Sequence, residues 1–320
     1  MGEPALGEAG QGSAGVAGGM PDEGLPFLTI LAPSKRANEK LRPRHKTLTR
    51  WAMQGILQTR RWLPHRRITV VGDSSFATLE LIAAVRRHAR LITRLRLDAS
   101  LFAPAPPRRP GQKGRPALKG KRLPKLSAVL ANPATVWTPL CVTDWYGGAT
   151  RHVEIASGVA VWYHAGLPPA PVRWVLVCDP ADKREPQAFL STNLEDEPAD
   201  ILGCFVSRWR IETTFQEVRR HLGVETQRQW SDLAILRTTP ALLGLFSLVT
   251  LWAGQLQGAV HPRGAAWYEK PEITFSDAIA AVRRAFWCPP HFSMSRLGQA
   301  TIEIPTSLFN RIIETACYAA

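Results

Sequence analysis

The sequence predicts an α/β protein whose sheet is mixed or parallel and is covered on its faces by helices. Segments of strand type alternate with segments of helical spacing in the first hundred residues after the N-terminal tail. The composition, 45% hydrophobic and 21% charged, is typical of a folded globular chain. A length of 320 residues is enough for one large domain or two smaller ones.

The elements of the predicted core follow in order along the chain. Strands and helices are expected to alternate, beginning with a strand, over residues 25–31, 47–63, 67–73, 75–88 and 91–97. Four further strand candidates then follow at 136–142, 151–163, 172–178 and 187–192. Helices are predicted at 198–222, which starts at Pro198 and stops at Gly223, and then at about 240–256, 276–287 and 307–318.

Composition divides the chain into five segments. The first, residues 1–24, contains eight Gly, four acids and no Lys or Arg, and we expect it to be disordered. Residues 25–98 form the first part of the core, 99–197 a basic loop with a β-rich insertion, 198–256 a charged helix with a following core helix, and 257–320 a helical extension.

The charge of the chain indicates an anionic partner. Forty Lys and Arg against 26 Asp and Glu give a net charge of +14, so nucleic acid is the first expectation and an anionic membrane the weaker one. The longest apolar run, 241–254, is shorter than the ~20 residues of a spanning helix and predicts a buried core helix instead. The five Cys are scattered and no signal peptide is visible, which favours a reducing, cytoplasmic compartment.

Two basic segments are candidates for contact with a polyanion. Residues 35–46 hold six Lys or Arg, and residues 104–125 form a Pro- and Gly-rich loop that we expect to be mobile. The second carries Arg108, Arg109, Lys113, Arg115, Lys119, Lys121, Arg122 and Lys125.

Asp73 is the first candidate for chemistry. It ends an apolar strand and precedes Ser74 and Ser75, and ligands of α/β folds bind where such strands end. The same position also suits an acid that caps a turn or helix. Position alone leaves both interpretations open.

The helix predicted from Pro198 carries an unusual pattern. Its residues at spacings of 3, 4, 3 and 4 alternate aromatic and charged side chains on one face, namely Phe205, Arg208, Glu212, Phe215 and Arg219. Pairing of Arg208 with Glu212 is the plain structural explanation, although such a pair adds only about 0.2–0.5 kcal/mol to a helix. Spacing does not decide between pairing and a functional role.

This helix resembles the signature helix of DDE transposases of the IS4 and IS701 type. That signature reads Tyr, two residues, Arg, three residues, Glu, six residues, Lys; Phe205 stands in place of the Tyr, Arg208 and Glu212 match, and Arg219 replaces the Lys. The segments 70–76 and 222–235 are also similar to this family. The similarity extends over roughly residues 25–287.

The resemblance implies an RNase H-like fold interrupted by a β-rich insertion, and a transposase that cuts and joins DNA with divalent metal ions, Mg²⁺ or Mn²⁺. Asp73 is then the second and Glu212 the third metal-binding catalytic acid. Arg208, Arg219 and the position of Phe205 would lie near DNA phosphate. Double-stranded DNA is the implied partner, with a homodimer on DNA in the bacterial cytoplasm.

The first acid of the family's triad lies on an opening strand upstream of the region that resembles residues 25–31. The acids available there, Glu3, Glu8, Asp22 and Glu23, stand in no apolar strand. The sequence therefore predicts that the opening strands and the first Asp are missing, as in a 5′-truncated gene. A non-catalytic DNA-binding remnant of a transposase is the alternative function.

Overall fold

The computed structural model describes residues 24–36, 45–108, 111, 113–145, 149–180, 185–226, 228–229, 231–256, 260–263, 270, 273–287 and 305–318. The predicted disordered tail and most of the basic segment 35–46 lie outside these residues. The chain divides into two compact units. One is Ile30–Glu212, and the other combines Met1–Thr29 with Thr213–Ala320.

The first unit contains a seven-stranded mixed sheet. Its strands are β1 (Thr69–Gly72), β2 (Arg90–Leu95), β3 (Leu101–Phe102), β4 (Thr138–Trp145), β5 (Ala149–Trp162), β6 (Ala170–Cys178) and β7 (Gln187–Ser191). They are ordered β1-β2-β7-β6-β5-β3, with β4 also paired to β5. Only β1 and β2 pair in parallel among these described strands. The strands that we predicted as an insertion therefore continue the sheet of β1 and β2.

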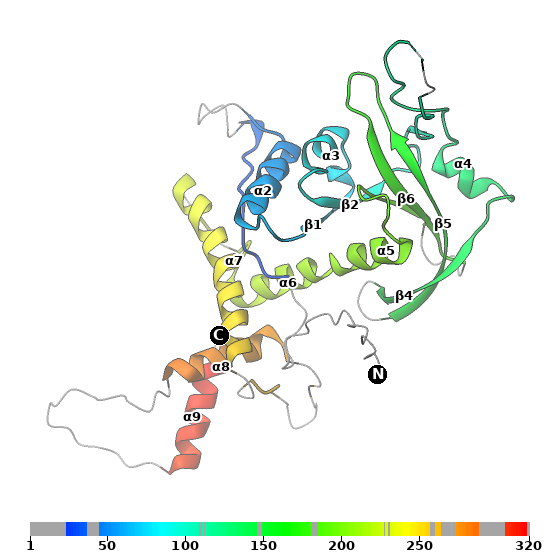
Figure 1. The fold of residues 1–320 in the computed structure, drawn as a ribbon. Helices are drawn as coiled ribbons and strands as arrows, with labels where there is room; N and C mark the ends of the chain where they lie inside the picture. The colour runs from blue at the N-terminus through cyan, green and yellow to red at the C-terminus, as the bar shows by residue number, and fades with distance from the viewer. Residues whose placement is uncertain are drawn as a thin grey trace, which may run out of the picture. The chain divides into compact units, whose positions relative to one another are not determined.

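Helices cover both faces of this sheet (Figure 1). On one face lie α2 (Leu48–Trp62), α3 (Leu79–Val85) and α4 (Leu126–Ala131), and on the other lies α5 (Pro198–Ser207). Successive side chains of a strand point to opposite faces of the sheet. Leu91 and Leu190 therefore pack in the core on the first face, while Ile92 and Phe189 pack in the core on the second. The structure confirms a mixed α/β architecture with flanking helices.

The strand predicted over residues 25–31 does not form. The described backbone there has no strand partner. Two carbonyls, one in this segment and one just before it, instead accept hydrogen bonds from side-chain hydroxyls: Pro26 O from Ser247 at 2.6 Å and Gly24 O from Thr214 at 2.7 Å. Because Pro26 lacks an N–H, it cannot donate to a strand ladder, which favours this side-chain anchoring.

The second unit is helical. It contains most of α6 (Arg210–Leu222), with α7 (Asp232–Gln255), α8 (Phe275–Trp287) and α9 (Thr306–Tyr318). The last two confirm the C-terminal helices expected from the sequence. α7 starts eight residues before the predicted position, because Ser231 caps it by accepting a hydrogen bond from the Ala234 N–H at 3.1 Å, and Pro240 lies inside the helix.

α7 is only in part the buried core helix that we predicted. Phe246, Val249 and Ala253 pack into the core of the helical unit, while Leu248 and Leu251 are about half exposed. Among the described helices, α7 is the one whose length and composition would suffice to cross a membrane, and 28% of its apolar window is buried. Soluble core helices share these properties.

A buried carboxylate joins the C-terminal elements of this unit. Asp277 is 1% exposed and accepts hydrogen bonds from Lys270, from the backbone of Thr274 and Arg263, and from the Tyr318 hydroxyl. Burial, with the adjacent Asp277 charge, raises the pKa of Tyr318 to about 12. Despite the opposing effect of burial, the hydrogen bond from Lys270 keeps the pKa of Asp277 below its usual value.

Candidate functional site

Asp73 stands directly after β1, as the sequence predicted. Its Oδ1 accepts two hydrogen bonds from Ser75, one from the backbone N–H at 2.9 Å and one from the hydroxyl at 2.6 Å. Asp73 thereby caps the 3₁₀ turn η1 (Ser74–Phe76), so the capping interpretation is correct for one oxygen. The residue is exposed, and both bonds leave Oδ2 able to accept a further ligand.

The helix predicted over 198–222 is two helices. α5 ends at Ser207 and α6 starts at Arg210, with a turn at Arg208 and Trp209. Hydrogen bonds across this junction span three residues, such as Arg208 N–H to Phe205 O at 3.2 Å and Glu212 N–H to Trp209 O at 2.9 Å. This 3₁₀ winding ends the single straight stripe that the 3-4-3-4 spacing predicted.

Phe205 is a core residue. It is 5% exposed, and its ring lies 4.6 Å from that of Phe189 on β7. The predicted contact of Phe205 with DNA is therefore corrected: the ring holds α5 against the sheet. The sequence pattern did not show this, because an aromatic side chain on a charged stripe suits either a surface or a buried position.

Arg208 and Glu212 form an ion pair after α5. The Arg208 Nη2 donates to Glu212 Oε1 at 3.2 Å, and the two side chains are 28% and 42% exposed. Arg208 Nε is buried without a hydrogen-bond partner. Because α5 packs against β1, β2, β4 and β7, the pair follows an element that contacts the strand carrying Asp73.

Arg219 is placed differently. Its guanidinium pairs with Glu225 at 2.6 Å, and both side chains are more than half exposed. Arg219 belongs to the helical unit, whereas Arg208 and Glu212 belong to the sheet unit. An anionic ligand of Arg219 would have to compete with Glu225.

Asp73 and Glu212 have the right donor chemistry for Mg²⁺ or Mn²⁺, since hard cations prefer carboxylate oxygens. Each carboxylate keeps one oxygen outside the hydrogen bonds described above. However, in the described part of the chain no group of three or more His, Cys, Asp or Glu side chains could hold a metal ion. The described residues can therefore contribute ligands to an ion but do not fit a complete two-ion site.

The basic loop is partly fixed. Lys119 Nζ lies 3.5 Å from the centroid of the Phe102 ring and 3.9 Å from that of Tyr163. The neighbouring Gly120 packs so closely on Pro104 O that an added Cβ would lie 2.6 Å away. Residues 119–123 thus pair along β3, which corrects the expectation of a mobile loop for this part.

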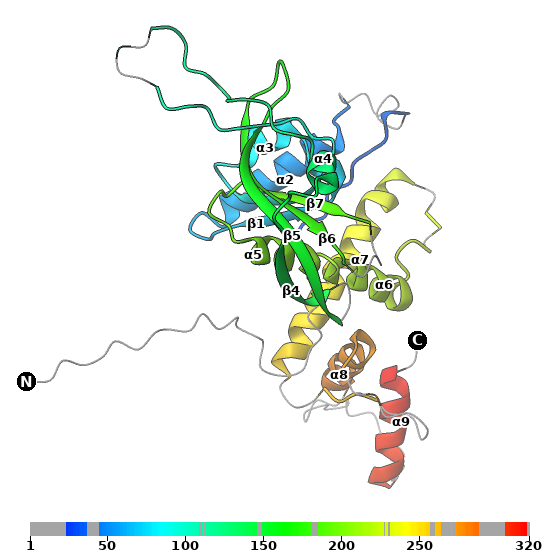
Figure 2. The ribbon, with the colours of Figure 1, turned by 90° about the vertical axis from the view of Figure 1, so that its right-hand side faces the viewer.

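The rest of the loop extends away from the sheet (Figure 2). Lys113 and Arg115 are exposed there, and Arg108 donates a hydrogen bond to Gly114 O at 3.0 Å. Lys121, on the part that pairs along β3, is also exposed. Arg109 lies outside the described residues. Among the described cations of the loop that were predicted to contact DNA, Lys113, Arg115 and Lys121 are therefore accessible, whereas the Lys119 ammonium is held between two rings.

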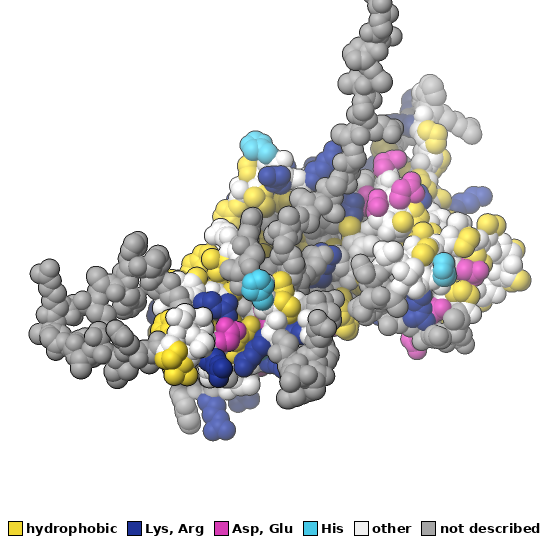
Figure 3. All heavy atoms as spheres, turned by 90° about the horizontal axis from the view of Figure 1, so that it is seen from below, with side chains coloured by type: hydrophobic (Ala, Val, Ile, Leu, Met, Phe, Trp, Pro, Cys, Tyr) yellow, Lys and Arg dark blue, Asp and Glu magenta, His cyan; other side chains and the backbone are white. Residues whose placement is uncertain are grey.

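The structure also assembles a basic pocket that sequence reasoning did not single out. It has a volume of about 670 Å³ and is lined by residues at the amino ends of β1 and β2. Its main signal in the sequence is two short basic runs, 65–67 and 86–88, which are 21 positions apart and come together only in the fold. Lys and Arg also form groups elsewhere, as the face in Figure 3 shows.

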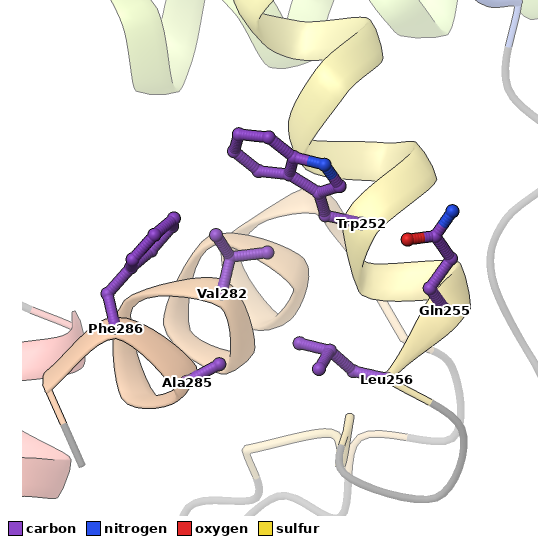
Figure 4. A pocket seen from close by; sticks show the side chains of 6 residues that line it. All are labelled: Trp252, Gln255, Leu256, Val282, Ala285 and Phe286. Carbon is purple, nitrogen blue, oxygen red and sulfur yellow. The ribbon is translucent and has the colours of Figure 1, made fainter. Parts of the chain in front are cut away.

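A second, smaller pocket of about 240 Å³ lies between α7 and α8 in the helical unit. Its side chains are mostly apolar, with the Trp252 and Phe286 rings 5.8 Å apart in an edge-on arrangement (Figure 4). Gln255 and the Trp252 indole supply its polar side-chain atoms. No pair of acid and base lines it, so it offers little for catalysis.

The family of DDE superfamily endonucleases matches residues 23–160 of the chain. No curated protein matches it. The match supports a DDE-type, transposase-like family and a nuclease-like function, and members of such a family generally use divalent metal ions and act on DNA. Asp73 lies within the matched residues, whereas Glu212 lies beyond them.

Proposed function

We propose that the chain is a transposase of the IS4/IS701 type, which binds transposon-end DNA and cuts and joins phosphodiester bonds by a metal-dependent DDE reaction. The observation that carries the proposal is Asp73, an exposed acid placed directly after β1 inside the residues that match the endonuclease family. We assign Asp73 and Glu212 as metal-binding catalytic acids. The role of Glu212 rests on the helix motif that it shares with Arg208.

The chain's own residues would act on DNA by charge and position. Mg²⁺ or Mn²⁺, when bound, would activate a nucleophile and stabilise the leaving oxygen. Arg208 can direct its guanidinium at a phosphate near Glu212, since a planar fork suits phosphate oxygens. Lys113, Arg115 and Lys121 would hold the duplex without reading its sequence. We expect a dimer on double-stranded DNA in the cytoplasm.

A non-catalytic DNA-binding remnant is the second candidate. It is favoured by the finding that the described residues contain no group of three or more His, Cys, Asp or Glu side chains that could hold a metal ion. Two carboxylates leave a divalent cation with few protein ligands, because Mg²⁺ prefers octahedral coordination. In this case the basic surface keeps its affinity for DNA while cleavage is absent.

One experiment separates the two candidates. The full chain is incubated with a labelled transposon-end duplex in Mn²⁺ or in EDTA, beside Asp73→Asn and the control Asp98→Asn. Asp98 is an exposed acid that follows β2 and pairs with Arg96. The transposase predicts nicking that needs Mn²⁺ and Asp73 but not Asp98. A mobility shift without nicking in any sample would establish the remnant, and no shift at all would contradict both.

A further inference from the structure

The pocket at the amino ends of β1 and β2 concentrates positive charge. Six arginines line it, against one acid, Glu195. The arginines are Arg60, Arg66, Arg67, Arg86, Arg87 and Arg90. A concave site lined by one sign of charge focuses its potential, and guanidinium groups bind phosphate oxygens in pairs.

Only some of these arginines interact with other groups of the protein. Arg90 pairs with the buried Asp196 at 3.2 Å, and Arg60 donates to Arg66 O at 2.8 Å. In the described part of the chain, the guanidinium groups of Arg66, Arg67 and Arg87 have no ion pair with a carboxylate, and all three residues are exposed. Such a group of like charges is favourable chiefly when an anion lies among them.

Helix ends account for some of the arginines but not for these three. Arg60 lies in the last turn of α2 and Arg86 caps α3, where cations gain about 0.3–1 kcal/mol from the helix dipole. Arg66 and Arg67 lie on the turn before β1, and Arg87 lies on the turn before β2. Their placement is therefore not explained by capping.

The part of the pocket lining that comes from the loop between β7 and α5 is held in place by a buried acid, Asp196. Asp196 accepts hydrogen bonds from the Ser191 hydroxyl and the Asn193 amide, in addition to Arg90. Asn193 thereby faces the pocket on a fixed loop between β7 and α5, and its backbone N–H bonds to the Ser191 hydroxyl at 3.2 Å. The pocket thus has one braced polar wall and one basic wall.

We infer that this pocket binds backbone phosphates of duplex DNA, as a second DNA contact separate from the Asp73 end of β1. Ile68 and Asp73 are five residue steps apart along an extended strand, or about 16 Å. A volume of about 670 Å³ and several cations suit consecutive phosphates of a nucleic-acid backbone better than one phosphate ion. The choice of DNA rests on the proposed function.

The test compares two charge-matched variants of the full chain. One is Arg67→Gln with Arg87→Gln in the pocket, both on turns. The other is Arg237→Gln with Arg311→Gln, which removes two exposed arginines of α7 and α9. Binding to a 20-base-pair duplex is measured by fluorescence anisotropy from 50 to 200 mM salt, and inorganic triphosphate is titrated separately.

We expect the pocket variant to bind the duplex about tenfold more weakly, with a log–log salt slope smaller by about two, because each lost phosphate contact removes about 0.9. The control should bind like the unchanged chain. Equal effects of the two variants, or no binding of the unchanged chain, would overturn the inference. It would also be overturned if Arg67 and Arg87 mattered for triphosphate but not for duplex.

The outcome is independent of cleavage. If the pocket variant loses affinity while the unchanged chain fails to nick DNA in Mn²⁺, the DNA contact stands and the proposed transposase activity fails. If the unchanged chain nicks DNA and the pocket variant binds it normally, the activity stands and the second contact fails.

Discussion

The two ends of the short strand β1 carry opposite chemistry. At its carboxyl end a single exposed acid, Asp73, has one oxygen bound to Ser75 and one able to take a further ligand. At its amino end Arg66 and Arg67 join Arg87 in a basic pocket. A strand of four residues therefore separates a position for a cation from a position for phosphate. Under the proposed function, the rigid strand β1 fixes the distance between Asp73 and the basic pocket that would anchor the DNA.

The largest effect should come from the carboxyl end. Asp73→Asn keeps the side-chain oxygen that caps η1, so folding should be unchanged. Loss of the negative ligand should lower the rate of Mn²⁺-dependent nicking about a thousandfold, because metal ions contribute several kcal/mol to such reactions. The rate is measured with a labelled duplex. A variant that nicks at the unchanged rate would remove Asp73 from the reaction.

The next effect concerns α5, the helix that precedes Glu212 and contacts β1. Phe205→Ala should lower the free energy of unfolding by about 3–5 kcal/mol, since it leaves a cavity between α5 and β7. Phe215→Ala, at an exposed position of α6, should cost far less. Urea unfolding of both variants measures the difference. Similar values for the two would mean that Phe205 lies on the surface.

At the amino end, the stability of the fold should depend on Asp196, the buried acid that holds Ser191, Asn193 and Arg90. Asp196→Ala leaves Arg90 without its partner and should lower stability by about 3 kcal/mol, the lower part of the range for a broken buried pair, because Arg90 keeps some exposure. Glu195→Ala, one residue earlier and exposed, is the control. Denaturant unfolding tests this, and an equal effect of both would contradict the role given to Asp196.

Asp277 in the helical unit contrasts with Asp73, because both of its carboxylate oxygens accept hydrogen bonds. One of these bonds comes from the Tyr318 hydroxyl. The raised pKa of Tyr318 means that the folded state retains its proton more strongly than the unfolded state. This contribution to stability is fully present below pH 10 and is lost as pH rises toward about 12. Tyr318→Phe should reduce the loss of melting temperature over this range. An unchanged pH profile would show that Tyr318 does not titrate with unfolding.

The smallest effect on stability belongs to Arg208. An ion pair four residues apart and partly exposed contributes about 0.3–0.5 kcal/mol, so Arg208→Gln should barely change unfolding. We nevertheless expect weaker binding of transposon-end duplex, measured by anisotropy, because a phosphate contact is lost. A large loss of stability with unchanged binding would make Arg208 a structural residue.

Local patterns predicted most of the strands, because apolar runs and turn residues are local signals, but the strand expected at 25–31 does not form and β3 was missed. The sequence predicted β1 with Asp73 after it, and β5, β6 and β7 within two residues at each end. It missed that these strands share one sheet, since pairing such as Ile92 with Ser191 depends on residues far apart in the chain. It also missed α4, a short helix next to a Pro-rich loop.

The site was predicted less completely than the fold. Helical spacing placed Arg208 beside Glu212 correctly, but it assumed a continuous helix and so placed Phe205 on the same surface stripe. The basic pocket could not be seen, because residues 65–67 and 86–88 are brought together only by the parallel pairing of β1 with β2. Tertiary contacts, which no local pattern contains, decided each of these cases.

The most direct test of the central claim, that Asp73 and Glu212 are metal-binding acids, is Mn²⁺ binding by the unchanged chain and three variants. Free Mn²⁺ is measured by electron paramagnetic resonance for the unchanged chain, Asp73→Asn, Glu212→Gln and the double variant. We predict that each single change lowers the Mn²⁺ affinity, because a carboxylate ligand is lost, and that the double variant binds Mn²⁺ most weakly. Unchanged Mn²⁺ affinity in either single variant would contradict the claim.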